Sequence, residues 1–148
     1  MRLIRIQVAL VAIAAAISMG SCGAAVDPLV GSWKVVWPAG SINASVTSVY
    51  AFNADKTLLI TASRPDSTTK CTSTSTNGGT WSASGNMLAI TLSSGTGSTT
   101  GCTNASMNLA DHPVTGFDTS PQAFTYSTDS ATLTVTRSDG STTMFARQ

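Results

Sequence analysis

Short apolar segments separated by turn sequences run along the chain from Gly31 to the C-terminus; two of them share one hairpin spacing, and a third repeats it one residue shorter. Each repeat has an aromatic residue, a turn, and then an apolar-x-apolar-Thr motif. The repeats are Phe52 with Leu58-x-Ile60-Thr61, Trp81 with Leu88-x-Ile90-Thr91, and Tyr126 with Leu133-x-Val135-Thr136. Alternation of apolar and polar residues over four to eight positions is typical of strands with one buried face. No helical period separates the segments, which indicates a meander of antiparallel hairpins and argues against a βαβ fold.

The alternation predicts eight strands. We expect them at residues 32–37, 46–52, 58–62, 78–83, 87–92, 124–126, 133–135 and 144–147. Eight antiparallel strands with one apolar face are most simply satisfied when the sheet closes on itself, because closure leaves no exposed edge. The predicted fold class is therefore all-β, an eight-stranded antiparallel up-and-down barrel, with a two-sheet sandwich as the alternative.

In an up-and-down meander, successive connections lie alternately at the two ends of the barrel. Tight turns near Asp55, Gly85 and Asp129 fall at the end where the first strand starts, and two long connections, 64–77 and 93–122, fall at the other end. For 93–100, a run of Ser, Thr and Gly, disorder stays open as an alternative to strand structure. Long connections are usually functional or disordered, so residues 104–118 are interpreted as a lid, a partner-binding rim or a plain variable loop.

Charge is sparse and shows no preference for an anionic polymer. Beyond the first 21 residues, six basic side chains face seven aspartates and no glutamate, and no basic run exists. Binding to a phosphate backbone needs a clustered positive surface. The composition therefore predicts no nucleic-acid partner, and its Ser and Thr content suits pleated surfaces.

Gly31-Ser32-Trp33 stands at the start of the first predicted strand, and Arg147 lies on the last. The Gly-x-Trp motif resembles that of lipocalins and of small bacterial lipocalin-like domains. In that family the tryptophan sits at the closed end of the barrel, with an arginine of the last strand packed over it. The resemblance implies a Trp33–Arg147 closure and a lipocalin-like barrel over residues 29–148. It concerns architecture, and function does not follow from it.

The N-terminus has the pattern of a secretory signal peptide. Arg2 and Arg5 precede an apolar run from Val8 to Met19, and small residues then lead into Cys22. This junction resembles the lipobox of bacterial lipoproteins, in which the cysteine becomes the mature N-terminus and carries fatty acyl groups such as palmitate. We therefore expect a signal peptide at 1–21, a lipidated N-terminus and tether at 22–28, and the barrel domain at 29–148.

The same resemblance predicts a lipid-anchored protein of the cell envelope. Gly23 stands where that family's inner-membrane retention signal would place an aspartate, which favours the outer membrane if the host has one. The alternative is cleavage after Ala24 or Ala25, which would give a freely secreted protein.

With Cys22 lipidated, Cys71 and Cys102 remain as an even pair in an oxidising compartment. We expect them to form a disulfide that joins the two long connections over the barrel mouth. A metal site is the rival interpretation, but His112 is the only histidine and no Cys-x-x-Cys motif exists.

The sequence offers no catalytic constellation. His112 beside Asp111 could be a base with its orienting carboxylate, but a lone histidine next to a proline in a loop is more often a surface residue. No serine lies in a nucleophile-elbow motif, and the glycines of 95–101 lack phosphate-loop spacing. We predict a non-enzymatic protein without metal or cofactor.

Binding inside the barrel is the favoured function. The predicted ligand-binding residues are Trp37, Tyr50, Leu88 and Ile90, with Val46 and Leu92 as further lining candidates. An eight-stranded barrel can be filled by its own side chains or can hold one small ligand, and both outcomes stay open. The expected ligand is a small apolar or amphipathic molecule. The alternatives are a protein-interaction or inhibitor-like module that acts through the disulfide-linked rim, and a structural envelope protein.

Overall fold

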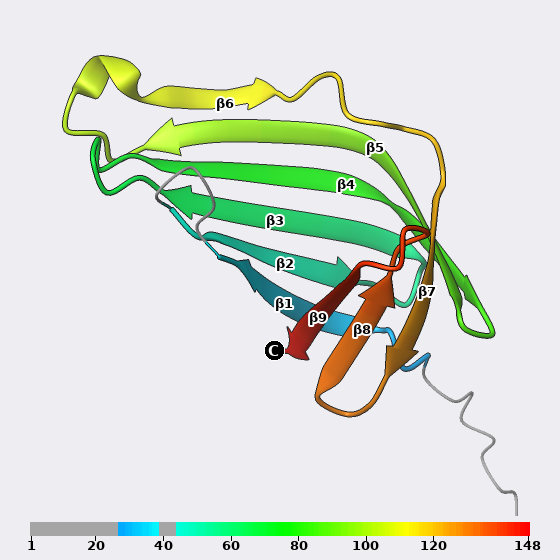
Figure 1. The fold of residues 1–148 in the computed structure, drawn as a ribbon. Helices are drawn as coiled ribbons and strands as arrows, with labels where there is room; N and C mark the ends of the chain where they lie inside the picture. Colours follow the sequence, from blue (N-terminus) through cyan, green and yellow to red (C-terminus); the bar gives the residue numbers. More distant parts are fainter. Residues whose placement is uncertain (1–26, 39–43) are drawn as a thin grey trace, which may run out of the picture.

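The computed structural model describes residues 27–38 and 44–148. The signal peptide, Cys22 and most of the tether lie outside these residues. Within the described residues the chain forms nine strands and one short 3-10 helix (Figure 1). The strands are β1 Gly31–Trp37, β2 Val46–Phe52, β3 Thr57–Pro65, β4 Thr72–Ser84, β5 Met87–Thr100, β6 Leu109–Pro113, β7 Gln122–Thr128, β8 Thr132–Thr136 and β9 Thr142–Arg147, and the helix η1 is Ala105–Met107.

Eight of the strands close into an antiparallel barrel, as predicted. The hydrogen-bonded order is β4-β3-β2-β1-β9-β8-β7-β5, and a further pairing of β4 with β5 completes the ring. The first and last strands meet where Trp33 pairs with Arg147. Because every strand of the ring has two neighbours, its backbone groups are satisfied without an exposed edge.

The core is built from the inward positions of the alternating strands. Its fully or nearly buried members are Leu29, Trp33, Val35, Phe52, Leu58, Trp81, Leu88, Leu133 and Phe145. Two aromatic pairs in the barrel pack edge-to-face. The Tyr50 and Phe145 ring centroids are 5.0 Å apart, and those of Phe52 and Trp81 are 5.4 Å apart. Such contacts add about 0.5–1.5 kcal/mol beyond the burial of area.

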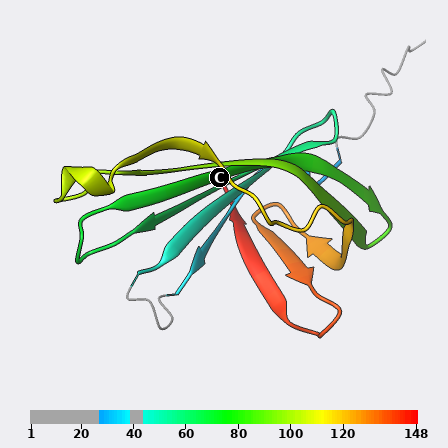
Figure 2. The same ribbon diagram turned by 90° about the horizontal axis from the view of Figure 1, so that it is seen from above.

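Strands β4 and β5 are much longer than predicted, and residues 93–100, for which disorder was an open alternative, belong to β5. Residues 72–77 pair in register with residues 95–100, and the β3–β4 connection shrinks to residues 66–71. Figures 1 and 2 show these strands running on past the short strands β7, β8 and β9. A run of Ser, Thr and Gly has no alternation of apolar and polar residues, so its sequence does not indicate a strand. It can still form one, because a neighbouring run of the same kind supplies partners for its backbone N–H and C=O groups.

The long connection after β5 is ordered and adds the ninth strand. Strand β6 pairs with the far half of β5, outside the ring of eight (Figure 1). Beyond β6 the chain continues along β5, where the Val114 N–H donates to the Gly95 carbonyl. A Cβ atom at Gly95 would lie 3.2 Å from both the Val114 and Phe117 side chains, and one at Gly97 would lie 3.3 Å from Val114. The glycines of β5 therefore provide the space into which this connection packs.

A bulge between β4 and β5 gives a test of the barrel geometry. The register shifts at Gly78/Gly79, where Ser93 is the extra residue, and a Cβ at Gly79 would overlap the backbone oxygen of Thr91. Gly79→Ala is expected to lower the free energy of unfolding by about 1–3 kcal/mol, because the backbone must move to admit the methyl group. Urea denaturation measures this loss.

The matched control is Gly78→Ala, which restricts the unfolded chain to the same degree. Its Cβ would meet only the Ser94 hydroxyl, at 2.7 Å, and that side chain can rotate away. Equal stability losses in the two variants would contradict the close backbone approach at Gly79.

Candidate functional site: a cavity inside the barrel

The closed end of the barrel is built around Trp33. Its indole N–H donates to the Leu29 carbonyl at 2.8 Å, and the Arg147 guanidinium lies over the ring, 4.5 Å from its centroid. Arg147 also donates to the Pro28 carbonyl at 2.8 Å. Gly31 has a φ of 136°, and a Cβ there would lie 3.2 Å from an Arg147 nitrogen, so the glycine of the Gly-x-Trp motif gives room to the arginine. The structure thus brings Trp33 and Arg147 together as the resemblance implied.

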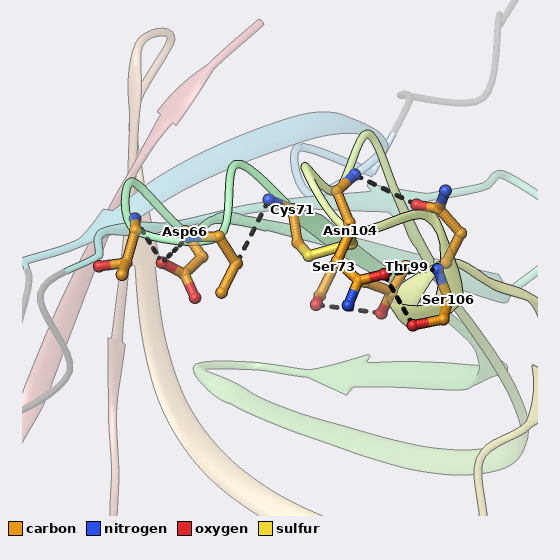
Figure 3. Close-up of a disulfide and its surroundings, with 10 residues drawn as sticks. Asp66, Cys71, Ser73, Thr99, Asn104 and Ser106 are labelled. Atoms are coloured by element: carbon orange, nitrogen blue, oxygen red, sulfur yellow. Dashed lines mark hydrogen bonds between the residues drawn. A yellow bond between two sulfur atoms is a disulfide. The ribbon is translucent and has the colours of Figure 1, made fainter.

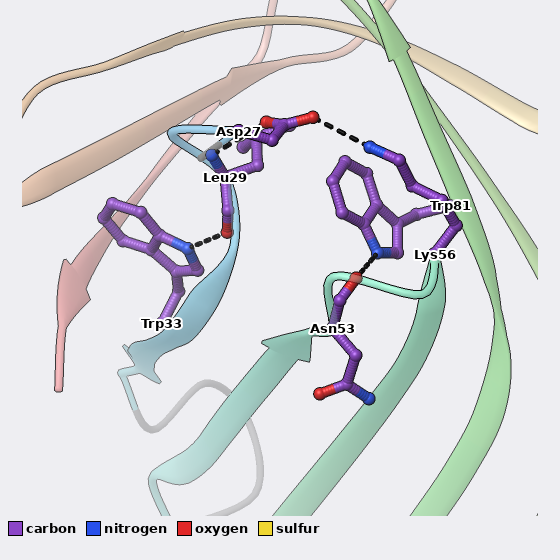
Figure 4. Close-up of polar contacts among 6 residues, drawn as sticks. All are labelled: Asp27, Leu29, Trp33, Asn53, Lys56 and Trp81. Atoms are coloured by element: carbon purple, nitrogen blue, oxygen red, sulfur yellow. Dashed lines mark hydrogen bonds and ion pairs between the residues drawn. The ribbon is translucent and has the colours of Figure 1, made fainter. Parts of the chain in front are cut away.

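A second cation–tryptophan pair lies at the same end and was missed from the sequence (Figure 4). The Lys56 ammonium lies 3.7 Å from the centroid of the Trp81 ring and also forms an ion pair with Asp27 at 2.8 Å. The Trp81 indole N–H donates to the Asn53 carbonyl at 3.1 Å. Lys56 occurs in the turn between two strands and Trp81 lies far along the chain, so only the fold of the hairpins brings them together. Asp27, which we placed in the tether, is thereby held against the barrel.

An apolar cavity of about 70 Å³ lies inside the barrel. All four predicted ligand-binding residues, Trp37, Tyr50, Leu88 and Ile90, line it. The remaining lining residues come from β2, β7, β8, β9 and the turn after β8: Phe52, Phe124, Leu133, Val135, Arg137, Thr143 and Phe145. Strand phase alone points these side chains inward, but the volume left between them depends on all of their sizes together. Whether this cavity holds a ligand stays a prediction.

A second hollow of about 150 Å³ adjoins the first and shares Tyr50, Ile90, Phe124 and Arg137 with it. Leu92, a predicted lining residue, borders this hollow, whereas Val46 borders neither. The hollow is further lined by Ile60, Asp118 and Gln122, so the end of the long connection reaches the cavity entrance. That connection therefore covers part of the mouth.

Two polar side chains mark the boundary between the two spaces. Burial raises the pKa of the Tyr50 phenol, and the positive charge of Arg137 acts in the opposite direction. The phenol therefore stays protonated at neutral pH and can donate a hydrogen bond. Arg137 was not among the predicted site residues, although Leu133-x-Val135-x-Arg137 continues the inward phase of β8.

The disulfide between Cys71 and Cys102 is present, as predicted (Figure 3). Its placement over the barrel mouth was wrong. Cys71 directly precedes β4 and Cys102 follows the end of β5, so the bond joins two neighbouring strands at the far end of their hairpin. The Ser73 and Thr99 hydroxyls, 3.3 Å apart, and the Thr103 N–H bonded to the Thr69 carbonyl reinforce the same junction. The correction follows from the unexpected length of β4 and β5, which carries both cysteines away from the mouth.

The other candidate groups raised by the sequence form no catalytic or metal site within the described residues. The His112 Nδ1 atom is 3.1 Å from the Ala110 carbonyl, and the side chain is exposed on β6. Residues 27–38 and 44–148 contain no group of three His, Cys, Asp or Glu side chains placed to hold a metal ion. Across the same residues, no helix has the length and apolarity needed to cross a membrane.

A closed eight-stranded meander, a Gly-x-Trp motif capped by an arginine of the last strand, and an internal apolar cavity define a lipocalin-like barrel. Residues 29–109 match the family model described as "Lipocalin-like domain", and the chain belongs to this family. The match covers β1 through β5 and stops at the first residue of β6, and the structure adds the strands that close the ring. No curated protein matches the chain.

Proposed function

We propose that this protein is an exported, membrane-anchored lipoprotein whose barrel binds a small apolar or amphipathic molecule without catalysis. The observation that carries the binding proposal is the apolar cavity lined by Trp37, Tyr50, Leu88 and Ile90. Lipocalin-like domains are typically binding proteins, which supports a carrier over an enzyme. The anchor proposal rests on the leader pattern that ends at Cys22.

The position of Asp27 suggests how an anchored barrel would be presented. Asp27 is held at the closed end by Lys56, and Cys22 precedes it by only five residues. An extended chain spans at most about 18 Å over that distance. Trp37 and Arg137 lie at the opposite ends of their strands from Trp33 and the β7–β8 turn. The closed end would then face the membrane and the cavity mouth would point away from it, toward a ligand in the aqueous phase.

Native mass spectrometry of residues 23–148, purified without detergent from the native host, tests the binding proposal. We expect an adduct of small molecular mass that is released on denaturation. Trp37→Ala, which opens the cavity wall, should reduce adduct occupancy, whereas Val36→Ala, at an exposed neighbouring position, should not. A bare chain mass in repeated preparations, together with no binding of apolar probes, would contradict the carrier proposal.

Cys22→Ser tests the anchor proposal separately. The variant is expected to remain an uncleaved, non-lipidated precursor, because the lipobox enzymes act on the cysteine. Mass spectrometry of the N-terminus and fractionation of membranes provide the readout. Normal cleavage of the variant, or a wild-type N-terminus at Ala25 or Val26, would support the freely secreted alternative.

The second candidate function is a protein-interaction module. It is favoured by the first part of the long connection after β5, where Met107 of η1 and Leu109 of β6 are 43% and 54% exposed. A photo-crosslinking residue at position 107 in living cells should capture one partner, and Leu109→Ser should abolish the capture. No specific crosslink in wild-type background would count against this function.

A further inference from the structure

Arg137 is the one charged side chain that borders both spaces inside the barrel. It follows Leu133 and Val135 at the inward period of β8 and begins the turn into β9, where its backbone N–H donates to Ser141 and its carbonyl accepts from Gly140. Those backbone bonds hold its Cα at the cavity mouth. Arg137 is exposed to solvent as a whole and also borders both spaces, so its charge stays hydrated at the entrance to an apolar interior.

The guanidinium has no ion-pair partner within the described residues, where Lys56 with Asp27 forms the one salt bridge. Two carboxylates lie nearby without forming an ion pair with Arg137, although hydrogen bonds from Ser141 and, to a lesser extent, the positive charge of Arg137 lower the pKa of Asp139. Asp118 accepts from the Ser120 N–H at 2.8 Å, and Asp139 accepts from the Ser141 N–H at 2.8 Å. The donors of Arg137 therefore remain available to a ligand, and a planar guanidinium matches the two oxygens of a carboxylate.

Tyr50 supplies a second donor on the same boundary. Its ring packs edge-to-face on Phe145, which fixes the side chain, and the phenol remains protonated as described above. Below this polar boundary the walls are apolar, formed by Leu88, Ile90 and Phe124 among others. The site thus has a polar entrance and an apolar interior.

This inference rests on the proposed function and names its ligand class. We propose that the barrel selects small amphipathic carboxylic acids, whose carboxylate binds Arg137 and Tyr50 while a short apolar body enters the cavity between Leu88, Ile90 and Phe124. The modest volumes of the two spaces favour a short body over a long acyl chain. An anion is favoured over a neutral amphiphile, because only the anion gains a charge-assisted hydrogen bond to the guanidinium.

Octanoate and octanol, which share one alkyl chain, provide the test on the mature chain, residues 22–148. Calorimetry and tryptophan fluorescence measure the two affinities. We expect octanoate to bind at least tenfold more tightly than octanol, and Arg137→Gln to weaken octanoate about tenfold with octanol unchanged. Arg137→Lys, which keeps the charge without the planar fork, should fall between wild type and Arg137→Gln. Arg64→Gln is the control, since it removes the same charge from an exposed position that borders neither space.

The outcomes separate the two levels of the proposal. Equal binding of octanoate and octanol, or a preference that survives in Arg137→Gln, would overturn acid recognition and leave the carrier function standing. Equal weakening by Arg64→Gln would assign the effect to net charge and would likewise overturn it. Failure of both probes to bind the folded wild-type protein would overturn the inference and count against the carrier function as well.

Discussion

Trp33→Ala is expected to lower the free energy of unfolding by about 3–5 kcal/mol, the range for truncating a buried aromatic residue. Trp33 has no exposed surface, and its loss removes the indole hydrogen bond to Leu29 together with the ring beneath Arg147. The backbone pairing of β1 with β9 remains in the variant, but the side-chain contact between Trp33 and Arg147 across that pairing is lost. Chemical denaturation followed by circular dichroism measures the change.

Arg147→Ala is the graded control for that result. It removes the cation from the ring but leaves Trp33 buried, so a smaller loss of about 0.5–2 kcal/mol is expected, the range for a cation–π contact. Because the two side chains interact, the double variant should lose less stability than the two single losses added together. Strict additivity of the two losses would contradict a direct contribution of the pair to barrel closure.

Replacing both Cys71 and Cys102 by serine is expected to cost about 3–4 kcal/mol, as the chain-entropy model gives for a crosslink over a loop of this length. The structure also predicts which part of the chain becomes locally less stable. Both cysteines lie at the far end of the β4–β5 hairpin, so amide exchange should accelerate at Ser73 and Thr99, far from the cavity. Denaturation and hydrogen exchange measure the two effects.

Reduction of the wild-type disulfide is the matching control and should reproduce the behaviour of the double serine variant. Octanoate binding should persist in both, because neither cysteine lines the cavity. Faster exchange around Tyr50 and Phe124, with the far end of the hairpin unchanged, would contradict the observed position of the disulfide.

Residues with a strong apolar period were predictable from the sequence, and the cavity walls followed from them. Trp37, Tyr50, Leu88 and Ile90 lie on the inward positions of their strands and meet in one space. Arg137 was overlooked, because an arginine next to a turn is ordinarily interpreted as a surface residue. Its phase after Leu133 and Val135 was the signal that could have identified it.

The Ser/Thr-rich halves of β4 and β5 could not be predicted from their own composition. Their backbone groups need a partner strand of matching length, and that partner is supplied by residues that carry equally little apolar signal. The Lys56–Trp81 contact was missed for a related reason, since it depends on how one turn lies against the next hairpin.

The sequence by itself indicated most of the inward-facing apolar side chains, the tight turns near Asp55, Gly85 and Asp129, and the pairing of Cys71 with Cys102, and its resemblance to lipocalins implied the Trp33–Arg147 closure. These features follow from a two-residue period, from local turn chemistry and from matching motifs at the two ends of the domain. Only the tertiary structure decided that a cavity remains, that β6 joins the sheet outside the ring, and that the disulfide lies away from the mouth. Each of these depends on the summed volumes and mutual register of strands far apart in the chain, which no local pattern specifies.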